Sequence, residues 1–220
     1  MLTKDLLIEE FPWKGFDDKV NWTNIVNKLN EGPYYPPLPH IFNAFQDIKP
    51  DDVKIVLLGQ DPYVNEGEAH GFSFSTLKEI IPPSLKNIFK ELYRSYNKKE
   101  EKVSGDLRGW KSDGVLMLNS ILTVSPKEPL SHKDIGWEQL TNNILQKLSN
   151  NGVIILAFGS YAREICNKIK NATFIETGHP SPRNTFNPFV GSDVFVKANQ
   201  MLLSKSIRPI RWIEKLKRIH

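Results

Sequence analysis

Cysteine is almost absent from this chain. Cys166 is the single cysteine among 220 residues, which excludes an internal disulfide, a four-cysteine iron–sulfur cluster and a cysteine zinc site. Because Cys166 lies among apolar neighbours in a helical pattern, we expect a small buried hydrophobic residue rather than a nucleophile. The internal histidines lie far apart without the spacing of a zinc-binding helix, and they give no support to a metal enzyme: His40, His70, His132 and His179.

Long hydrophobic runs are missing as well. No stretch approaches the roughly 20 apolar residues of a membrane helix. The opening segment, MLTKDLLIEEFPWK, carries too many charges in its apolar part for a signal peptide. We therefore expect a soluble, intracellular protein with no membrane partner. It would be cytoplasmic in a bacterial or viral setting, which the many Lys and Asn codons favour, and nuclear in a eukaryotic host.

The sequence contains neither repeats nor low-complexity segments. Its length of 220 residues, 40% of them hydrophobic, predicts one globular domain. We divide this domain into an N-terminal helical and Pro-rich cover (1–50), an α/β core (51–205) and a basic C-terminal tail (206–220). The net charge of +4 and the pI near 9.0 favour an anionic partner. The tail itself indicates no particular function.

The hydrophobic pattern of the core predicts strands and helices in alternation along the chain. Short apolar runs predict strands at residues 53–58, 115–118, 153–158 and 172–176. Apolar residues at spacings of three and four predict helices at residues 84–96, 137–148, 161–169 and 193–203. This alternation indicates an α/β fold with a single domain and a central four-stranded parallel sheet flanked by helices.

Polar residues follow each of the four predicted strands. VKIVLL runs into GQDPYV, VLML into Asn119, VIILAF into GS, and ATFIE into TGHPSP. Ligands of parallel sheets bind outside the carboxyl ends of the strands, where these residues meet. A carboxylate there can stabilise an oxocarbenium-like cation, and an imidazole can donate a hydrogen bond to a leaving group. The set favours cleavage of a glycosidic-type bond, and no Gly-rich phosphate loop, nucleophile elbow or zinc-helix motif is present.

Several longer motifs occur in a fixed order. GQDPYV is followed by EAHGFSFS, LMLNSILTV, AFGSYA and GHPSP, with YPPLPH, PPSL and SHKDIGWEQ at matching places. Over roughly residues 35–212 the chain resembles the family 1 uracil-DNA glycosylases. The resemblance implies a monofunctional enzyme, without cofactor or lyase step, that flips uracil out of DNA and hydrolyses its N-glycosidic bond to initiate base excision repair. It implies uracil-containing DNA as the partner of a monomer; a proteinaceous glycosylase inhibitor or replication proteins would be further partners that the sequence does not identify.

The resemblance assigns the chemistry to Asp61 and His179. Asp61 would orient the attacking water and stabilise the cationic sugar. His179 would hydrogen-bond the uracil carbonyl and stabilise the leaving anion electrostatically. Taken alone, an aspartate before a proline is typical of a turn residue that bonds its own backbone, and a single histidine is usually structural. Within these motifs the catalytic interpretation is favoured for both residues.

The resemblance also implies a uracil pocket. Asn119 would read the edge of the base and reject cytosine, whose donors and acceptors are reversed. Tyr63 would stand against C5 and exclude the methyl group of thymine, because a hydrophobic pocket alone discriminates one methyl group by only about 1–3 kcal/mol. Phe74 would stack on the flipped base, and Gln60 would support the pocket. For either ring alone, packing in the core is the commoner interpretation.

Three serines fit contacts with DNA phosphates. They are Ser84 after two prolines, Ser160 after a glycine, and Ser181 between two prolines. Ser84 and Ser160 are also predicted N-caps of the helices that follow, and a capped helix N-terminus is itself an anion site. Similar loops in the family grip the DNA backbone, which helps to offset the few kcal/mol needed to unstack a base.

The chain departs from the family at two positions. Val64 stands where relatives usually have a histidine that is associated with a phosphate contact, so we expect weaker DNA binding with intact chemistry. Arg183 stands where a leucine usually wedges into the minor groove. An arginine could fill the gap by stacking on bases, pair with a phosphate, or lie in a solvated loop.

Two alternative functions stay open, the first of which is motivated by Val64 and Arg183. One is a DNA-binding or replication-accessory protein that keeps the fold with little activity, against which the intact Asp61, Asn119 and His179 argue. The other is a glycosylase of broader specificity that acts on mismatched thymine or other damaged bases, against which Tyr63 argues.

Overall fold

The four predicted strands form one parallel sheet in the computed structural model, which describes residues 1–184 and 188–219. β1 (Ile55–Gly59) pairs with β2 (Val115–Asn119) on one side and β3 (Ile154–Phe158) on the other, and β4 (Thr173–Thr177) extends the sheet beyond β3. The order is therefore β2-β1-β3-β4. Because all strands run in the same direction, their carboxyl ends meet along one edge of the sheet. The predicted α/β fold is confirmed.

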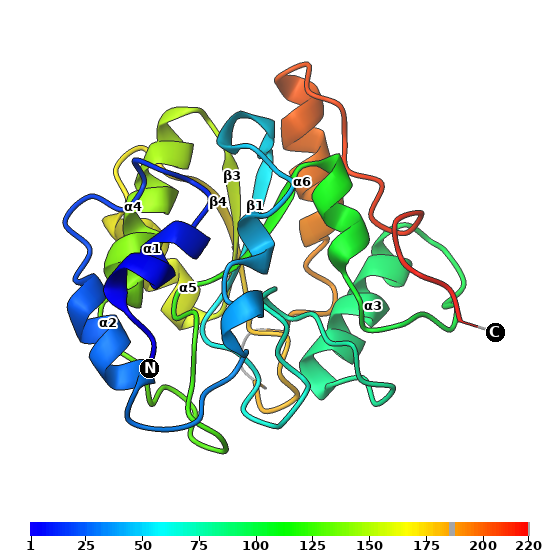
Figure 1. Cartoon of the computed structure of the whole chain (residues 1–220). Helices are drawn as coiled ribbons and strands as arrows, with labels where there is room; N and C mark the ends of the chain where they lie inside the picture. Colours follow the sequence, from blue (N-terminus) through cyan, green and yellow to red (C-terminus); the bar gives the residue numbers. More distant parts are fainter. Residues whose placement is uncertain (185–187, 220) are drawn as a thin grey trace.

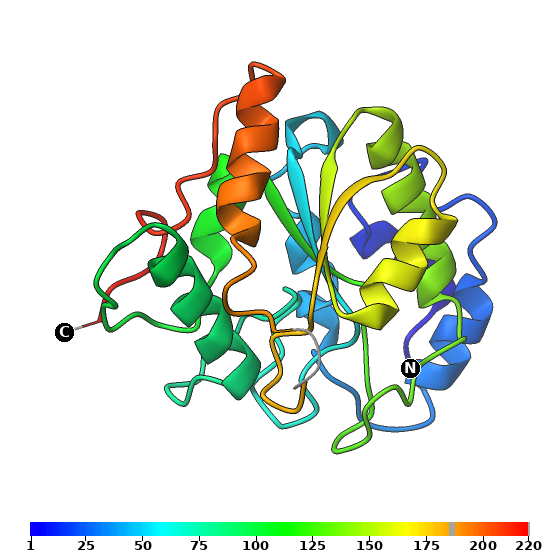
Figure 2. The same cartoon turned by 180° about the vertical axis from the view of Figure 1, so that it is seen from behind.

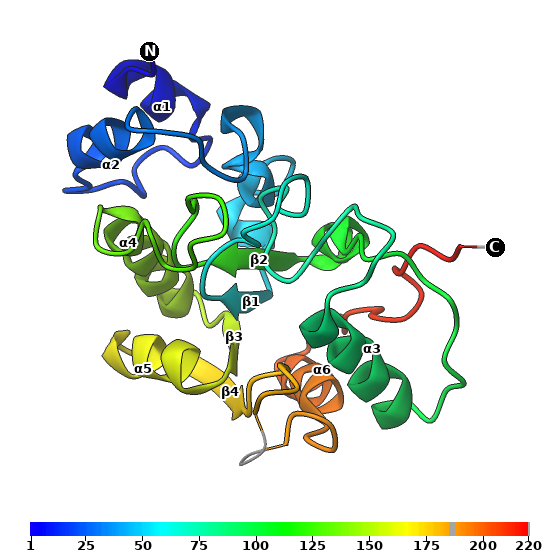
Figure 3. The ribbon, with the colours of Figure 1, turned by 90° about the horizontal axis from the view of Figure 1, so that it is seen from below.

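Helices cover both faces of this sheet (Figure 1). Viewed along the strands, α4 (Trp137–Asn150) and α5 (Ser160–Lys168) lie on one side, and α3 (Pro83–Ser95) and α6 (Val194–Ser204) lie on the other (Figure 3). The loops that follow the strands gather at the lower end of the molecule in the reverse view (Figure 2). This arrangement leaves one end of the sheet for a site.

The N-terminal segment packs on the α4 side of the sheet (Figure 3). It contains two short helices and three single turns of 3₁₀ helix. Its Trp22 packs edge-on against Trp137 of α4, with ring centroids 6.3 Å apart. A further 3₁₀ helix precedes β2. Their bounds are α1 (Lys4–Glu10), α2 (Trp22–Leu29), η1 (Leu38–His40), η2 (Asn43–Phe45), η3 (Pro50–Asp52) and η4 (Arg108–Asp113).

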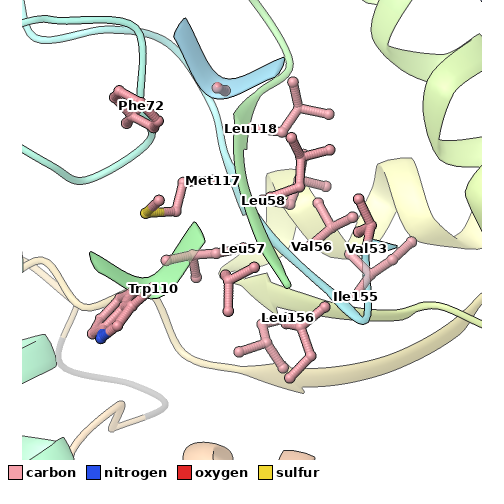
Figure 4. Packing of buried hydrophobic residues seen from close by; sticks show 14 of the residues in the cluster. Val53, Val56, Leu57, Leu58, Phe72, Trp110, Met117, Leu118, Ile155 and Leu156 are labelled. Atoms are coloured by element: carbon pink, nitrogen blue, oxygen red, sulfur yellow. The ribbon is translucent and has the colours of Figure 1, made fainter. Parts of the chain in front are cut away.

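The strands β1, β2 and β3 are buried on both faces, which explains why they read as continuous apolar runs. Leu57 and Met117 point towards Trp110, whereas Leu58 and Leu118 point to the opposite side (Figure 4). All five side chains are at most 1% exposed. The sheet thus separates two halves of one hydrophobic core and holds the strand ends rigidly.

The eight predicted helices and strands of the core are confirmed, with bounds that shift by one or two residues. The predicted N-caps are wrong. Pro82 and Gly159 occupy those positions, while Ser84 and Ser160 already lie inside α3 and α5. Proline presets the entry into α3, and Gly159 turns the chain with a φ of 89°, a conformation that serine rarely adopts.

Burial describes Cys166 and the C-terminal segment as well. Cys166 is 1% exposed, as expected for a small buried residue, and burial raises the pKa of its thiol to about 12. The basic C-terminal segment is packed against the core, because Trp212 is 1% exposed and its carbonyl accepts a hydrogen bond from Trp110 Nε1 at 2.8 Å. The boundaries assigned to the cover, core and tail stay predictions.

Candidate active site

The carboxyl ends of the strands open into a cavity of about 410 Å³. Most of the predicted site residues line it, together with the divergent Val64: Gln60, Asp61, Tyr63, Phe74, Ser84, Asn119, His179 and Arg183. Ser160 and Ser181 lie outside this cavity, in an adjoining hollow that shares Gln60, Phe74 and His179. The fold therefore brings together residues that are up to 123 positions apart in the sequence, as the numbering of Gln60 and Arg183 shows.

Asn119 ends β2 at the side of Gly59, its register partner on β1. Its side chain is 8% exposed, and its amide forms no hydrogen bond with any residue that the structure describes. A Cβ atom at position 59 would lie 2.2 Å from Asn119 Oδ1, so only glycine leaves room for the amide. Asn119 can therefore offer both a donor and an acceptor to a ligand in the cavity.

Asp61 lies two residues beyond the end of β1, and its carboxylate is held by a distant loop. Leu130 N donates to Asp61 Oδ2 at 2.8 Å. Burial is the largest influence on Asp61 and raises the pKa of its carboxyl group, while the hydrogen bonds from the Leu130 and Asp61 amides oppose this by favouring the ionised form. The carboxylate has one oxygen that is fixed by the protein.

Two aromatic side chains form walls of the cavity and are tied to each other. Tyr63 OH donates to the carbonyl oxygen of Phe74 at 2.8 Å. Phe74 has a φ of 61°, a left-handed conformation that is uncommon for a bulky residue and persists only where its surroundings impose it. Burial raises the pKa of Tyr63, so its hydroxyl stays protonated and keeps donating. This hydrogen bond fixes the separation of the two walls.

The protonation of His179 follows from its surroundings. Ser181 N donates to His179 Nδ1 at 3.0 Å, so Nδ1 is an acceptor and the hydrogen of the neutral ring resides on Nε2. Burial lowers the pKa of His179 below its ordinary value, which favours this neutral form. The ring lies 6.2 Å from that of Phe74, centroid to centroid. His179 can therefore donate a neutral hydrogen bond from Nε2.

Helix α3 holds the loop that carries His179. Asn87 Nδ2 donates to Pro180 O at 2.8 Å. Further along the helix, the fully buried Glu91 accepts hydrogen bonds from Gly191 N at 2.7 Å and Asp193 N at 2.6 Å. One helix thus holds the chain at Pro180 and again at Gly191 and Asp193, and Ser84 lies in its first turn.

The two divergent residues occupy different surroundings. Val64 is half-buried, and its carbonyl oxygen accepts a hydrogen bond from Lys127 N at 2.9 Å. Arg183 is exposed, and its backbone N–H donates to Ser181 Oγ at 3.3 Å. Ser84 is half-buried at the mouth of the cavity, and Ser160 is exposed at the start of α5. Their contacts with DNA stay predictions.

Several supporting residues escaped the sequence patterns. Gly59 acts by being small and Leu130 through its backbone N–H, whereas the others form side-chain hydrogen bonds to backbone groups, which no sequence motif marks. The glycine that precedes QDPY was the one available signal. The residues are Gly59, Ser73, Asn87, Glu91, Ser120 and Leu130.

Two other kinds of functional feature are missing from the part of the chain that the structure describes. Among residues 1–184 and 188–219, no three His, Cys, Asp or Glu side chains are grouped so that they could hold a metal ion. Within the same residues, no helix has the length and apolar composition needed to cross a membrane.

Most of the chain matches a known protein family. The model of the uracil DNA glycosylase superfamily matches residues 45–203. The chain belongs to this superfamily. The match includes the three strand ends that supply Asp61, Asn119 and His179 to the cavity.

Relatives within the superfamily cover almost the whole chain. The uracil-DNA glycosylase of Francisella philomiragia is 41% identical over 216 residues, which cover 88% of this chain and 99% of the relative. That of Borrelia hermsii is 41% identical over 213 residues, with 94% and 95% coverage. That of Campylobacter lari is 44% identical over 197 residues, with 86% and 85% coverage.

Solved structures of the superfamily agree with the fold. A mimivirus UNG variant in complex with UGI has a TM-score of 0.83 and 26% identity, covering 96% of this chain and 91% of that one. The UNG from Nitratifractor salsuginis has a TM-score of 0.66 at 20% identity, covering 94% and 97%, a likeness that shows the fold alone.

Proposed function

We propose that this chain is a family 1 uracil-DNA glycosylase, a hydrolase that flips uracil out of DNA and leaves an abasic site for base excision repair. The observation that carries the proposal is the convergence of Asp61, Asn119 and His179 in one cavity, with Tyr63 as a wall. Superfamily membership and relatives with the name uracil-DNA glycosylase support it. The ordered motifs quoted above support the assignment to family 1.

In this proposal the bond between C1′ of the deoxyribose and N1 of uracil breaks, and its electron pair leaves with the base. His179 donates from Nε2 to a uracil carbonyl and stabilises the anion. Asp61 stabilises the cationic sugar and orients the water that adds to C1′, and the proton released by this water neutralises the uracil anion. A neutral imidazole suits this role because an anion gains from a fixed hydrogen bond without a proton having to transfer.

Selection of uracil would depend on Asn119 and Tyr63. The Asn119 amide, which has no hydrogen-bond partner among the described residues, offers a donor and an acceptor to the base edge. Cytosine would leave both mispaired in a buried place. Tyr63 cannot swing away to admit a methyl group without breaking its bond to Phe74 O. The pocket would therefore reject both normal pyrimidines before chemistry begins.

The surroundings of the cavity fit the DNA backbone. We infer that Ser84, Ser160 and Ser181 contact phosphates around the flipped nucleotide, and that Arg183 lies where the base has left the stack. The family resemblance of the ordered motifs supports a monomer. The mimivirus relative in complex with UGI supports a proteinaceous inhibitor as a further partner.

The test uses oligonucleotides that contain one uracil, single- and double-stranded, with matched thymine and cytosine controls. The expected result is release of free uracil and formation of abasic sites without strand cleavage, with no added metal. Binding to uracil-free DNA without any release would instead favour the accessory protein. Release of mismatched thymine at rates near those for uracil would favour the broader glycosylase.

A further inference from the structure

Asp61 is held by a residue that is 69 positions away in the sequence. Leu130 N donates to Asp61 Oδ2 at 2.8 Å, although the Leu130 side chain is 37% exposed. The backbone of Leu130 has a φ of 62°, which a leucine keeps only where its surroundings impose it. The conformation that aims this N–H at Asp61 therefore needs a cause in the neighbouring residues.

Part of that cause lies in hydrogen bonds within residues 125–133, here called the 125–133 segment. Ser125 N donates to Ser131 Oγ at 2.7 Å, which closes the segment into a compact loop. Lys127 N donates to Val64 O at 2.9 Å and ties the segment to the loop that carries Asp61. The donor and the carboxylate that receives it are thus held by a common set of contacts.

A buried histidine anchors the same segment to the core. His132 is 2% exposed, with Nδ1 2.8 Å from Thr123 Oγ1 and Nε2 3.1 Å from Ser125 Oγ. Trp137 Nε1 donates to the same Thr123 hydroxyl at 2.6 Å. Burial lowers the pKa of His132 to about 4, so the ring is neutral near pH 7 and joins two hydroxyl groups without a buried charge.

We propose that the 125–133 segment is a positioning device for Asp61, in which His132 and Ser131 fix the segment and Leu130 N–H fixes one carboxylate oxygen. The inference rests on the proposed function, because it adds positioning residues to that reaction. Rotation of a carboxylate about its last bond is otherwise broad. Holding one oxygen aims the other at the reacting centre before substrate arrives, and removes the reorganisation that a free carboxylate would need.

The direct test replaces the Pro129–Leu130 peptide bond by an ester, which removes the N–H and keeps the leucine side chain. Single-turnover release of uracil is measured at saturating protein between pH 4.5 and 8. A lost hydrogen bond to a charged acceptor predicts a rate about tenfold lower or more. It also raises the pKa of Asp61, so the acid side of the pH profile moves up by about one unit. Affinity for DNA stays the same.

A second test uses ordinary substitutions. Ser131→Ala removes the acceptor of Ser125 N–H and loosens the segment, whereas Ser131→Thr retains a hydroxyl at the same place. We expect Ser131→Ala to lower the rate and move the acid midpoint upwards with unchanged KM, and Ser131→Thr to restore both. Lys133→Ala, at an exposed position of the same segment, is the matched control and leaves the profile unchanged.

The outcomes separate the two proposals. A wild-type protein that releases no uracil contradicts the proposed function. If the wild type is active and both the ester and Ser131→Ala forms keep its rate and acid midpoint, the positioning role is contradicted while the proposed function stands. The folded fraction of each variant is measured by circular dichroism. If the rate falls only in proportion to this fraction and the acid midpoint does not move, the positioning role is also overturned, because a merely structural role would give that result.

Discussion

Gly59 and Asn119 end neighbouring strands, and the amide oxygen of Asn119 occupies the space that a side chain at position 59 would need. An ideal Cβ at Gly59 would lie 2.2 Å from Asn119 Oδ1 and 2.8 Å from Ser73 Cβ. Ser73 cannot retreat easily, because it is fully buried and its hydroxyl donates to Leu57 O at 2.8 Å, so the Asn119 amide would have to move. The position of the Asn119 amide thus requires glycine at position 59.

Gly59→Ala should therefore displace Asn119 while Asp61 and His179 remain. A misplacement of about 1 Å in a catalytic site can cost about 10²-fold in rate, and we expect a loss of that order in uracil release. Gly32→Ala is the matched control, since no atom lies within 4 Å of the added Cβ. Equal rates for the two variants, from single-turnover assays, would contradict the dependence.

Removing the Tyr63 side chain should admit thymine. Tyr63→Ala opens the wall that is now fixed by the bond to Phe74 O, and the remaining preference for uracil should fall to the about 10–200-fold that one methyl group can give. Tyr63→Phe keeps the ring, so it should still reject thymine while losing about 1 kcal/mol of stability. Competition between uracil and thymine oligonucleotides measures the preference. Thymine release by Tyr63→Phe would show that the ring alone is not the barrier.

Asp61→Asn should separate chemistry from binding. The amide keeps the size of the carboxylate and loses its charge, so we expect turnover to fall by about 10²–10⁴-fold while affinity for DNA survives. Fluorescence anisotropy with a uracil oligonucleotide measures binding in parallel with release of the base. Wild-type turnover in this variant would remove Asp61 from the reaction.

Two buried histidines should make the fold sensitive to mild acid. Burial lowers the pKa of His70 and of His132 to about 4 in the folded protein, below the unfolded value of about 6.5. Between these values the unfolded chain binds protons that the folded chain does not. The free energy of unfolding should therefore fall as the pH drops from about 6.5 to 4, by up to about 1.4 kcal/mol per pH unit for each histidine.

Urea unfolding at several pH values checks this slope. The double variant His70→Gln, His132→Gln removes both groups and should show a flatter dependence above pH 4.5, although it is less stable at pH 7. The same slope in the double variant would assign the acid sensitivity to other groups.

The sheet and the set of residues in the cavity were predictable because burial leaves a mark on sequence. Parallel strands covered on both faces become uninterrupted apolar runs, and Val56 to Leu58 is such a run with a turn motif directly behind it. The topology then places the carboxyl ends together, so Asp61, Asn119 and His179 had to lie near one another.

The support of those residues was not predictable in the same way. Every residue except proline carries a backbone N–H, so nothing in the sequence marks Leu130 as the donor to Asp61. The predicted N-caps failed for a related reason. Serine is a common cap, but the neighbouring Pro82 and Gly159 already impose the required backbone geometry.

Helix α3 also limits how the chain can change in length. Ser84 lies in its first turn, Asn87 and Glu91 hold the His179 loop further along, and a helix turns by about 100° per residue. One inserted or deleted residue between Ser84 and Glu91 would rotate one of these groups off its partner. Insertions and deletions among related sequences should instead accumulate just after the helix, in the exposed turn at residues 97–100. This turn neither lines the cavity nor holds the His179 loop.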